Sequence, residues 1–374
     1  MAATLSRLFK VVFPPYPEPS AVAEGAAGPL RIGVLGAADI APRAVVHPAK
    51  LMPDKVQIYS VAARNPEKAK AFAKQFGIPH THDSYDELLA DPQIQAVYIP
   101  LPNGLHYEWA VKCIERGLPV LLEKPAAANA DQTAKLFAIA KEKNVLVVEA
   151  FHWWFYPDAQ KAKAIISNKE EFGELLSYEG SLAAHGLPKK ENVRYDFALA
   201  GGSIMDMGCY PICWMRYFMG EEPVSAKGLG ATCFPGNPKI DAVASVEYAF
   251  ASNPEKKGIV HCGMKTPYST LFKIGFLPYF KIKGTKKTLL FTNPLFPNLF
   301  HSVEVTDNAT GVTTMETVYE PGKEHWSTYT YQMEAFANLV TGATDTPYFS
   351  NENSVANMKA VDMAYEAIGY PIRE

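Results

Sequence analysis

Residues 33–41 (Gly-Val-Leu-Gly-Ala-Ala-Asp-Ile-Ala) follow a short apolar run and have the composition of a phosphate-binding turn. Gly36 and the small Ala38 would let a pyrophosphate approach backbone N–H groups at the start of a helix, which we expect near Asp39. The match to G-x-G-x-x-G is incomplete, because Gly33 and Gly36 are three residues apart and alanines replace the later glycines. The turn predicts a dinucleotide site, with a plain tight turn of another α/β protein as the alternative.

The end of the second apolar run reads Val61-Ala62-Ala63-Arg64-Asn65. A site that prefers NAD usually presents an acid here to the ribose 2′-hydroxyl, and this segment has none. Arg64 could instead pair with a 2′-phosphate and lie on the adenine, because a planar guanidinium suits both contacts. The segment favours NADP, with NAD still possible. A solvated arginine at a helix start is the alternative for Arg64.

A lysine stands at the end of another apolar run, in Leu121-Leu122-Glu123-Lys124-Pro125. The carboxyl edge of an open α/β sheet is where ligands bind, so a lysine at this edge is a candidate for contact with cofactor or substrate. A salt bridge with Glu123 is the alternative.

These residues need a doubly wound sheet to position them. Short apolar runs alternate with amphipathic stretches from residue 30 to residue 150, which predicts a parallel sheet covered by helices on both faces. We expect strands at 30–35, 57–62, 96–99, 120–122 and 146–149, and helices at 66–76, 85–90, 107–116 and 130–143. The fold class is therefore α/β, with a Rossmann domain at residues 30–150.

The pattern changes after Phe151 to longer alternating segments, which predicts a large, mainly antiparallel sheet in an α/β domain spanning residues 151–374. Examples of the expected strands are 242–250, 257–264, 270–277, 281–283 and 301–306. Two helices, about 328–340 and 354–368, would end the chain and pack beside the first domain. We interpret residues 1–29, rich in Pro, Ala and Gly, as an arm and linker, although Arg7 and Lys10 faintly resemble a transit peptide.

Composition excludes several classes of partner. The chain has 374 residues, 36 basic and 39 acidic, so the net charge of -3 does not indicate binding to nucleic acid or to an anionic membrane. No apolar run approaches the roughly 20 residues that cross a bilayer. The five cysteines are odd in number and scattered, which predicts reduced thiols, no metal site and a soluble cytoplasmic protein.

Six segments in order resemble the glucose-fructose oxidoreductase and inositol dehydrogenase family, the Gfo/Idh/MocA proteins. The resemblance extends over nearly everything after residue 30 and is carried by residues 33–41, 63–69, 102–106, 123–125, 149–151 and 201–211. It implies a Rossmann domain, a second domain whose open sheet often forms a homodimer interface, and an active site between them. The pattern Asp206-x-Gly208-x-Tyr210 is similar to that of aldose and dihydrodiol dehydrogenases in the family.

By this resemblance, Lys124 and Tyr210 match catalytic positions, and Asn103 and His106 match residues that line the nicotinamide side of the pocket. Oxidising an alcohol needs a base, and tyrosine has an unperturbed pKa of about 10, so a nearby cation must stabilise its phenolate. We assign Tyr210 as the proton acceptor and Lys124 as the cation that lowers its pKa. Asp206, four residues before Tyr210 and so on the same helix face, would hydrogen-bond the substrate or the lysine.

The full set of predicted site residues follows from these arguments. The catalytic residues are Lys124, Tyr210 and Asp206. The cofactor-binding residues are Gly33, Gly36, Ala38, Asp39, Ile40, Arg64, Pro102, Asn103, His106, Glu123 and Lys124. Each has a structural alternative: Tyr210 as a packed helix aromatic, Asp206 as a helix cap, and His106 as a packing residue.

The segment Glu149-Ala150-Phe151-His152-Trp153-Trp154-Phe155 departs from the family pattern, because Trp154 replaces an arginine. The cleft becomes more aromatic, which suits the apolar face of a pyranose or an aromatic diol, although buried core is an alternative. The predicted substrate-lining residues are Phe151, Trp154, Arg194 and Tyr195.

Three functional hypotheses follow. The first is an NADP-dependent aldose 1-dehydrogenase with a substrate such as D-xylose and a lactone product. The second is a trans-1,2-dihydrodiol or other cyclic polyol dehydrogenase. The third is a regulator that binds NADP or sugar on the same fold without catalysis, because fold does not fix function.

Overall fold

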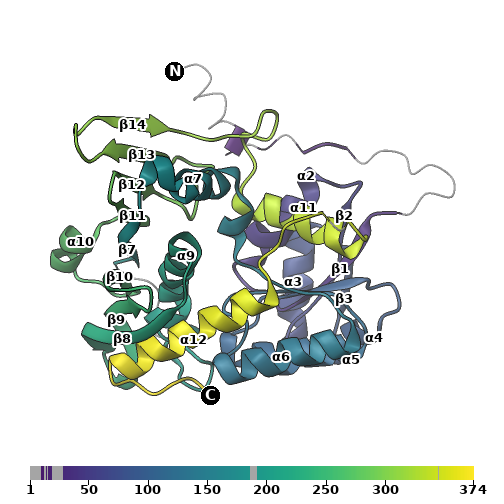
Figure 1. Ribbon diagram of the computed structural model, residues 1–374. Helices are drawn as coiled ribbons and strands as arrows, with labels where there is room; N and C mark the ends of the chain where they lie inside the picture. The colour runs from purple at the N-terminus through teal and green to yellow at the C-terminus, as the bar shows by residue number, and fades with distance from the viewer. Residues whose placement is uncertain (1–9, 12–13, 15, 19–27, 186–191, 344) are drawn as a thin grey trace.

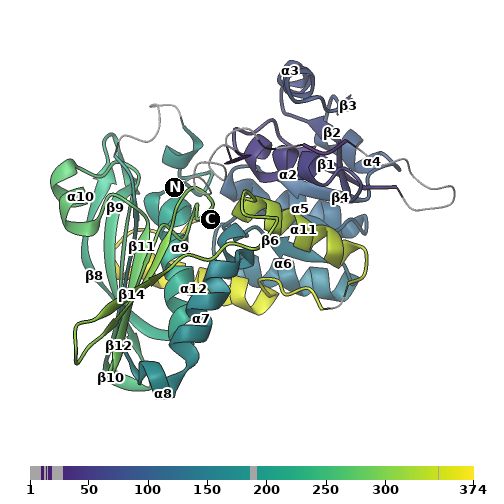
Figure 2. The ribbon, with the colours of Figure 1, turned by 90° about the horizontal axis from the view of Figure 1, so that it is seen from above.

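The computed structural model describes residues 10–11, 14, 16–18, 28–185, 192–343 and 345–374. Most of the predicted arm, residues 1–29, lies outside the described residues. Two sheets face each other across helices, with the parallel sheet in the purple and blue half of the chain and the larger sheet in the teal and green half (Figures 1 and 2).

The first sheet has six parallel strands in the order β3-β2-β1-β4-β5-β6. The bounds of these strands are β1 (Leu30–Leu35), β2 (Val56–Ala62), β3 (His80–His82), β4 (Ala96–Ile99), β5 (Val120–Leu122) and β6 (Val147–Glu149). Strand order reverses between β1 and β4, so a ligand is expected beyond the carboxyl ends of these two strands. The predicted doubly wound sheet is confirmed.

The helices of this half are α2 (His47–Leu51), α3 (Pro66–Phe76), α4 (Tyr85–Ala90), α5 (His106–Glu115) and α6 (Ala130–Lys143). Helix starts follow local chemistry: the Asn129 side chain accepts a hydrogen bond from the Gln132 N–H at the start of α6. The helix expected near Asp39 begins at Ala41 instead and is π-helical over Pro42–Val46 before α2. Proline is favoured in the first turn, because it has no N–H to leave unpaired there, so Pro42 moves the start two residues on.

The second sheet has eight strands in the order β14-β13-β12-β11-β7-β10-β9-β8. Neighbouring strands are antiparallel except for the parallel pair β7 and β10. The bounds of these strands are β7 (Leu175–Ala183), β8 (Pro223–Phe234), β9 (Asn237–Phe250), β10 (Asn253–Gly263), β11 (Tyr279–Gly284), β12 (Lys287–Thr292), β13 (Ser302–Asp307) and β14 (Thr313–Glu316). The mainly antiparallel character predicted from the alternating pattern is confirmed.

One face of this sheet is covered by the buried helix α9 (Cys209–Met219), whose Phe218 ring lies 4.4 Å from the Phe280 ring of β11. Helices α7 (Pro157–Ser167) and α8 (Lys169–Phe172) lie toward one end of the sheet (Figure 2). Helix α12 (Asn351–Ala367) packs on α6, α9 and β8, so it joins the two halves. Helix α11 (Thr328–Val340) buries Met333 and Phe336 in the core of the parallel sheet.

The strand predicted at 270–277 is wrong. Residues Tyr268–Ile274 form helix α10, with Leu271 and Ile274 buried on one face and Phe272 exposed. A short apolar run fits either period, and here the spacing of Leu271 and Ile274 is helical. Helix α10 follows Pro267, which favours a helix start over a strand interior.

Candidate functional site

The phosphate turn has the shape that a dinucleotide requires. Gly36 adopts φ 119°, a conformation open to glycine, and its N–H donates to the Ala62 carbonyl at 2.7 Å. Within the described residues, the backbone N–H groups of residues 37–40 donate to no acceptor. Unpaired amides at a helix start form an anion site, so the turn fits a pyrophosphate. Gly36, Ala38, Asp39 and Ile40 belong to this turn, whereas Gly33 lies inside β1, where a side chain would collide with Leu88. Their contacts with a cofactor stay predictions.

Arg64 follows the carboxyl end of β2 and is exposed. No carboxylate of the described residues lies within ion-pair distance of its guanidinium. This leaves its hydrogen-bonding fork available to a phosphate.

Lys124 from the parallel-sheet domain contacts Asp206 from the second domain. Lys124 Nζ donates to the Asp206 backbone carbonyl at 2.6 Å and to Asp206 Oδ1 at 3.3 Å. Arg194 Nε donates to Asp206 Oδ2 at 2.7 Å. Asp206 does not cap a helix, because both carboxylate oxygens are used by these cations. The Asp206 carboxylate is thus held between two cations, one from each domain.

The charges of this cluster set each other's ionisation. Burial alone raises the pKa of Asp206, but Lys124 and Arg194 outweigh burial and lower it. Burial alone lowers the pKa of Lys124, but the Asp206 carboxylate, together with Cys209 and Glu123, raises it. Asp206 and Lys124 are therefore both charged near neutral pH.

The Tyr210 ring lies under the Lys124 ammonium, with Nζ 5.0 Å from the ring centroid. Its hydroxyl is 3.0 Å from His152 Nε2, and His152 Nδ1 is 2.7 Å from the Thr328 hydroxyl. Burial raises the pKa of Tyr210 well above its ordinary value. Lys124 was expected to lower the pKa of Tyr210, but burial, together with Tyr329 and Glu123, raises it instead.

His106 and Glu123 hold the loops that carry the cluster. His106 is fully buried, with Nδ1 2.8 Å from the Pro125 carbonyl and Nε2 2.8 Å from the Leu101 carbonyl. Burial lowers its pKa to about 4. Glu123 Oε1 accepts from the Tyr98 hydroxyl at 2.7 Å. These contacts fix the segments before Pro102 and around Lys124, so the packing alternative is favoured for His106.

Asn103 connects the two domains. Its Nδ2 donates to the Ala200 carbonyl at 3.1 Å, and the adjacent Gly104 N–H donates to Leu199 at 3.1 Å. The loop after β4 is therefore tied to the loop that leads to Asp206.

The predicted substrate-lining residues divide into two groups. Arg194 joins the cluster through Asp206, and the Phe151 ring lies 5.5 Å from the Tyr210 ring. Trp154 packs on Tyr217 at 4.3 Å between ring centroids, and Tyr195 stacks on Phe234 at 3.6 Å. The structure brings Phe151 and Arg194 to the cluster, whereas Trp154 and Tyr195 contact other aromatic residues.

A buried ion pair positions the chain before Asp206. Arg373 donates to Asp241 Oδ1 and to the Gly201 carbonyl, both at 2.6 Å, and the side chains of Arg373 and Asp241 are both 0% exposed. Asp241 Oδ2 accepts from the Ser203 hydroxyl and from the Ile204 N–H, each at 2.7 Å. Gly202 has φ 133°, and a Cβ there would collide with Asp241 and Arg373.

Sequence reasoning missed His152, which contacts the Tyr210 hydroxyl, and its neighbours Thr328 and Tyr329. The His152 and Tyr329 rings are 4.0 Å apart. His152 follows β6, so its place at the carboxyl edge of the sheet was the available signal, but Thr328 comes from α11 and its approach required the tertiary fold.

Two family models match the chain. The model for the oxidoreductase family with an NAD-binding Rossmann fold matches residues 30–151, and the model for the Gfo/Idh/MocA C-terminal domain matches residues 159–290. The chain belongs to the Gfo/Idh/MocA family. The predicted resemblance, fold class and oxidoreductase class are confirmed, together with a nicotinamide dinucleotide as the class of cofactor.

Relatives of this Gfo/Idh/MocA chain include sugar and diol dehydrogenases. It is 32% identical to D-xylose 1-dehydrogenase (NADP(+)) 2 of Haloferax volcanii, over 90% of this chain and 97% of that protein. It is 35% identical to trans-1,2-dihydrobenzene-1,2-diol dehydrogenase of Xenopus tropicalis, over 46% of this chain and only 52% of that protein. The chain is therefore an oxidoreductase of a family whose members act on sugars and diols.

Solved structures share the fold of this family member. A 3-ketoreductase from Actinomadura kijaniata, in complex with NADP and TDP-benzene, has a TM-score of 0.77 and 23% identity over 91% of this chain and 98% of that one. An aldose-aldose oxidoreductase from Caulobacter crescentus, complexed with glycerol, has a TM-score of 0.76 and 18% identity over 91% and 97% of the two chains.

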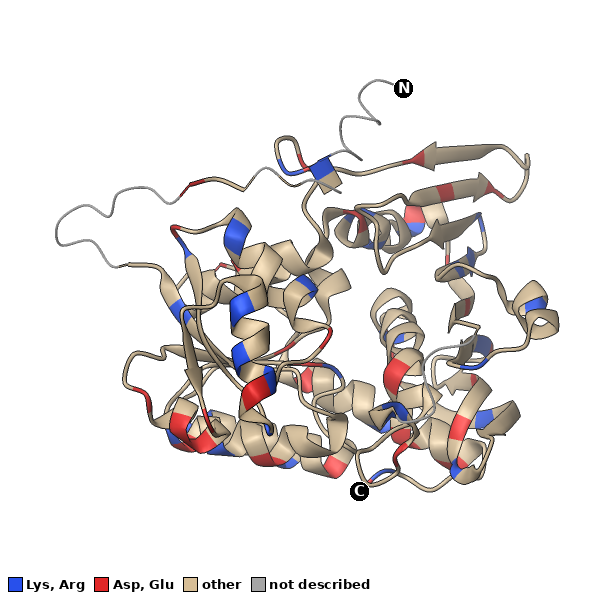
Figure 3. Ribbon diagram, turned by 180° about the vertical axis from the view of Figure 1, so that it is seen from behind, with Lys and Arg blue, Asp and Glu red and all other residues tan. Residues whose placement is uncertain are grey.

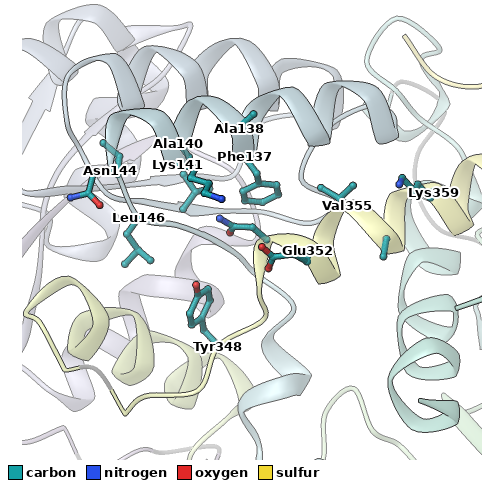
Figure 4. A pocket seen from close by; sticks show the side chains of 14 residues that line it. Phe137, Ala138, Ala140, Lys141, Asn144, Leu146, Tyr348, Glu352, Val355 and Lys359 are labelled. Atoms are coloured by element: carbon teal, nitrogen blue, oxygen red, sulfur yellow. The ribbon is translucent and has the colours of Figure 1, made fainter. Parts of the chain in front are cut away.

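The structure also has a surface groove that lies apart from the Lys124 cluster. A groove of about 670 Å³ runs between α6 and α12, with Phe137, Lys141 and Val355 among its lining residues (Figure 4). No predicted site residue lines it. Basic and acidic residues are interspersed on many of the surrounding helices (Figure 3). Over the described parts of the chain, no group of three metal-ligating side chains occurs and no helix could span a membrane.

Proposed function

We propose that this Gfo/Idh/MocA protein is an NADP-dependent aldose 1-dehydrogenase that oxidises the anomeric hydroxyl of a sugar such as D-xylose to a lactone. The observation that carries the proposal is the convergence of Lys124, Asp206 and Tyr210, with Lys124 at the same carboxyl edge of the parallel sheet as the phosphate turn. The similarity to the haloarchaeal D-xylose dehydrogenase, over 90% of this chain, supports the substrate class.

A nicotinamide, when bound, would supply the acceptor for the hydride of the sugar C–H bond. The residues of this chain handle the proton and the orientation. Tyr210 accepts the proton of the anomeric hydroxyl, and Lys124 holds the sugar oxygen through an N–H. Asp206 and Arg194 fix the Lys124 side chain, because Asp206 accepts from both cations.

The preference for NADP rests on Arg64 and on the absence of an acid in residues 61–65. The unpaired amides at residues 37–40 would hold the pyrophosphate, while the Arg64 guanidinium would pair with the 2′-phosphate.

A substrate screen tests the proposal. The purified protein is incubated with NADP or NAD and with D-xylose, D-glucose, myo-inositol or trans-1,2-cyclohexanediol, and reduced nicotinamide is followed by absorbance. We expect the highest kcat/KM with an aldose and NADP. Higher kcat/KM with the diol would contradict the aldose assignment. Tight NADP binding without reduction by any alcohol would identify a regulator instead.

Replacing Lys124 tests the site itself. We expect Lys124→Met to lower kcat/KM about 100-fold or more, since it removes a charge-assisted hydrogen bond and a positioned cation. Lys135→Met, on the exposed surface of α6, is the control and should leave kcat/KM within twofold. Equal activity of the two variants would contradict the assignment of Lys124.

The second candidate is a trans-1,2-dihydrodiol dehydrogenase. The identity to the Xenopus tropicalis diol dehydrogenase and the aromatic rings of Phe151, Tyr329 and Phe296 near Tyr210 favour it. The diol arm of the screen decides between the two candidates.

We also propose that the protein is a homodimer joined through the sheet of the second domain. The face opposite α9 carries the partly exposed residues Glu179, His261 and Tyr279. The Tyr279 hydroxyl donates to Glu179 at 3.0 Å, and His261 Nε2 lies 3.8 Å from the same carboxylate. Light scattering after size exclusion tests this, and a monomeric mass would contradict it.

All five cysteines are free, which supports a reducing compartment such as the cytoplasm.

A further inference from the structure

His152 is the hydrogen-bonding partner of the Tyr210 hydroxyl. The distance from His152 Nε2 to the Tyr210 oxygen is 3.0 Å, and the distance from His152 Nδ1 to the Thr328 oxygen is 2.7 Å. The three side chains come from three separate segments, namely the turn after β6, the start of α9 and the first turn of α11. His152 is 1% exposed and Thr328 is 0% exposed.

The imidazole at this position is neutral. Burial, with smaller effects of Lys124 and Arg43, lowers the pKa of His152 to about 3. A neutral imidazole has one N–H and one nitrogen lone pair, so it donates to one neighbour and accepts from the other. Two arrangements are possible, and they differ in which hydroxyl hydrogen is left without an acceptor.

In the first arrangement, Nδ1–H donates to Thr328, and Tyr210 donates to Nε2. The Thr328 hydrogen then has no acceptor among the described residues, although its side chain is fully sealed from water. In the second arrangement, Thr328 donates to Nδ1, and Nε2–H donates to the Tyr210 oxygen. The unpaired hydrogen then belongs to Tyr210, which is 5% exposed. Leaving a sealed hydroxyl unpaired costs more than leaving one that would bond the proposed substrate, so the second arrangement is favoured.

We propose that His152 is a positioning residue for Tyr210: Thr328 fixes the imidazole in the Nε2–H tautomer, and Nε2–H donates to the Tyr210 oxygen. This inference rests on the proposed dehydrogenase function. The donated hydrogen bond stabilises the phenolate without adding a charge, and it turns the hydroxyl hydrogen of Tyr210 away from His152.

This assigns separate tasks to the two neighbours of Tyr210. Lys124 lies over the ring face and is committed to Asp206, whereas His152 approaches the oxygen. The other charged or titratable groups that act on Tyr210 are Tyr329, Glu123, Cys209 and Asp206, all of which disfavour the phenolate. A neutral donor at the oxygen compensates for their effect. When the alcohol proton moves to the Tyr210 phenolate, the bond from Nε2–H remains in place and no proton passes to His152.

The pH dependence of kcat for sugar oxidation tests the donor role. We expect His152→Phe to lower kcat about tenfold to hundredfold, which is the range for losing a hydrogen bond to a charged group. The pH at which kcat reaches half its maximum should rise by about one unit or more, while the KM for the sugar changes little. His152→Gln places an amide N–H near the position of Nε2 and should restore both kcat and the pH profile to within about threefold.

The control is His80→Phe, on the outer strand β3, where the histidine is exposed. It should leave the pH profile unchanged. Equal losses in His152→Gln and His152→Phe, or an unchanged profile in His152→Phe, would overturn the donor role.

A second measurement does not depend on the activity of any variant. ¹⁵N NMR of wild-type protein labelled at histidine, with His152→Gln used only to assign the resonance, reads the tautomer directly. We expect a protonated Nε2 and an unprotonated Nδ1 across neutral pH. A protonated Nδ1 would overturn the inference, whereas a wild-type protein that oxidises no alcohol would overturn the proposed function and leave the tautomer result standing.

Discussion

The buried pair of Arg373 and Asp241 gives a prediction whose size follows from the structure. Arg373 donates to Asp241, to the Gly201 carbonyl and to the Pro371 carbonyl. Replacing Arg373 by Met leaves the Asp241 carboxylate buried at 0% exposure without its counterion. Breaking a buried pair by removing one partner costs roughly 3–5 kcal/mol.

The melting temperature reports this loss. For a domain of roughly 220 residues, 1 kcal/mol corresponds to about 2 °C, so we expect Arg373→Met to lower Tm by about 6–10 °C. Calorimetry or far-UV circular dichroism measures the shift. Arg116→Met is the matched control, because Arg116 lies at the surface beside the exposed Asp86 and should change Tm by less than about 1 °C.

The same substitution should affect catalysis. The Gly201 carbonyl loses a donor, and the chain from Gly201 to Asp206 loses one of its anchors, while Asp241 keeps its bonds to Ser203 and Ile204. At temperatures below the melting transition, we expect the kcat/KM of the variant to be lower than that of the wild-type protein. A double variant, Arg373→Met with Asp241→Asn, should recover part of Tm, because it removes the buried charge while the amide oxygen can still accept from Ser203 and Ile204. A Tm shift under 1 °C for Arg373→Met would refute the reasoning.

Two further predictions concern the cofactor and pH. Arg64→Ala should weaken NADP binding about tenfold or more and leave NAD binding nearly unchanged. Fluorescence titration measures both affinities, with Lys68→Ala as the control. Equal effects on both cofactors would contradict a contact between Arg64 and the 2′-phosphate. Burial raises the pKa of Glu149 to about 7 in the folded state, compared with about 4.3 in the unfolded state. Between these two pH values the folded state binds the extra proton, so the free energy of unfolding falls as pH rises. Glu149→Gln should remove this slope and raise stability at pH 8 by about 3 kcal/mol, and chemical denaturation at pH 5 and pH 8 measures the difference.

Local chemistry accounts for what the sequence predicted well. The strands of the parallel sheet are buried on both faces and read as continuous apolar runs, so their positions follow from composition alone. Lys124 and the turn at Gly36 lie at strand ends, where topology brings them to one edge of the sheet. The contact of Asp206 with Lys124 is one of the two partners predicted for Asp206, whose spacing from Tyr210 indicated that both side chains point into the cleft.

Contacts between distant segments account for what was missed. His152 and Tyr210 are 58 residues apart, and His152 and Thr328 are 176 apart, so no spacing rule joins them. The helix α10 replaced a predicted strand because Leu271 and Ile274 bury one face, and burial depends on neighbours that a local window does not contain. Trp154 was predicted to line the substrate cleft because it is aromatic, but its ring packs against Tyr217.

The contacts of Lys124 leave room for the substrate contact that we propose for it. A lysine ammonium has three N–H donors, and Asp206 takes two of them, one through its backbone carbonyl and one through Oδ1. Among the described residues no acceptor takes the third, so it is available to a sugar oxygen that enters beside Tyr210. Because Asp206 is also bound by Arg194, a substrate need not displace the lysine from its carboxylate to be held. In the proposed mechanism, the two domains thus deliver an oriented donor and a proton acceptor to the same sugar hydroxyl, one through Lys124 and the other through Tyr210.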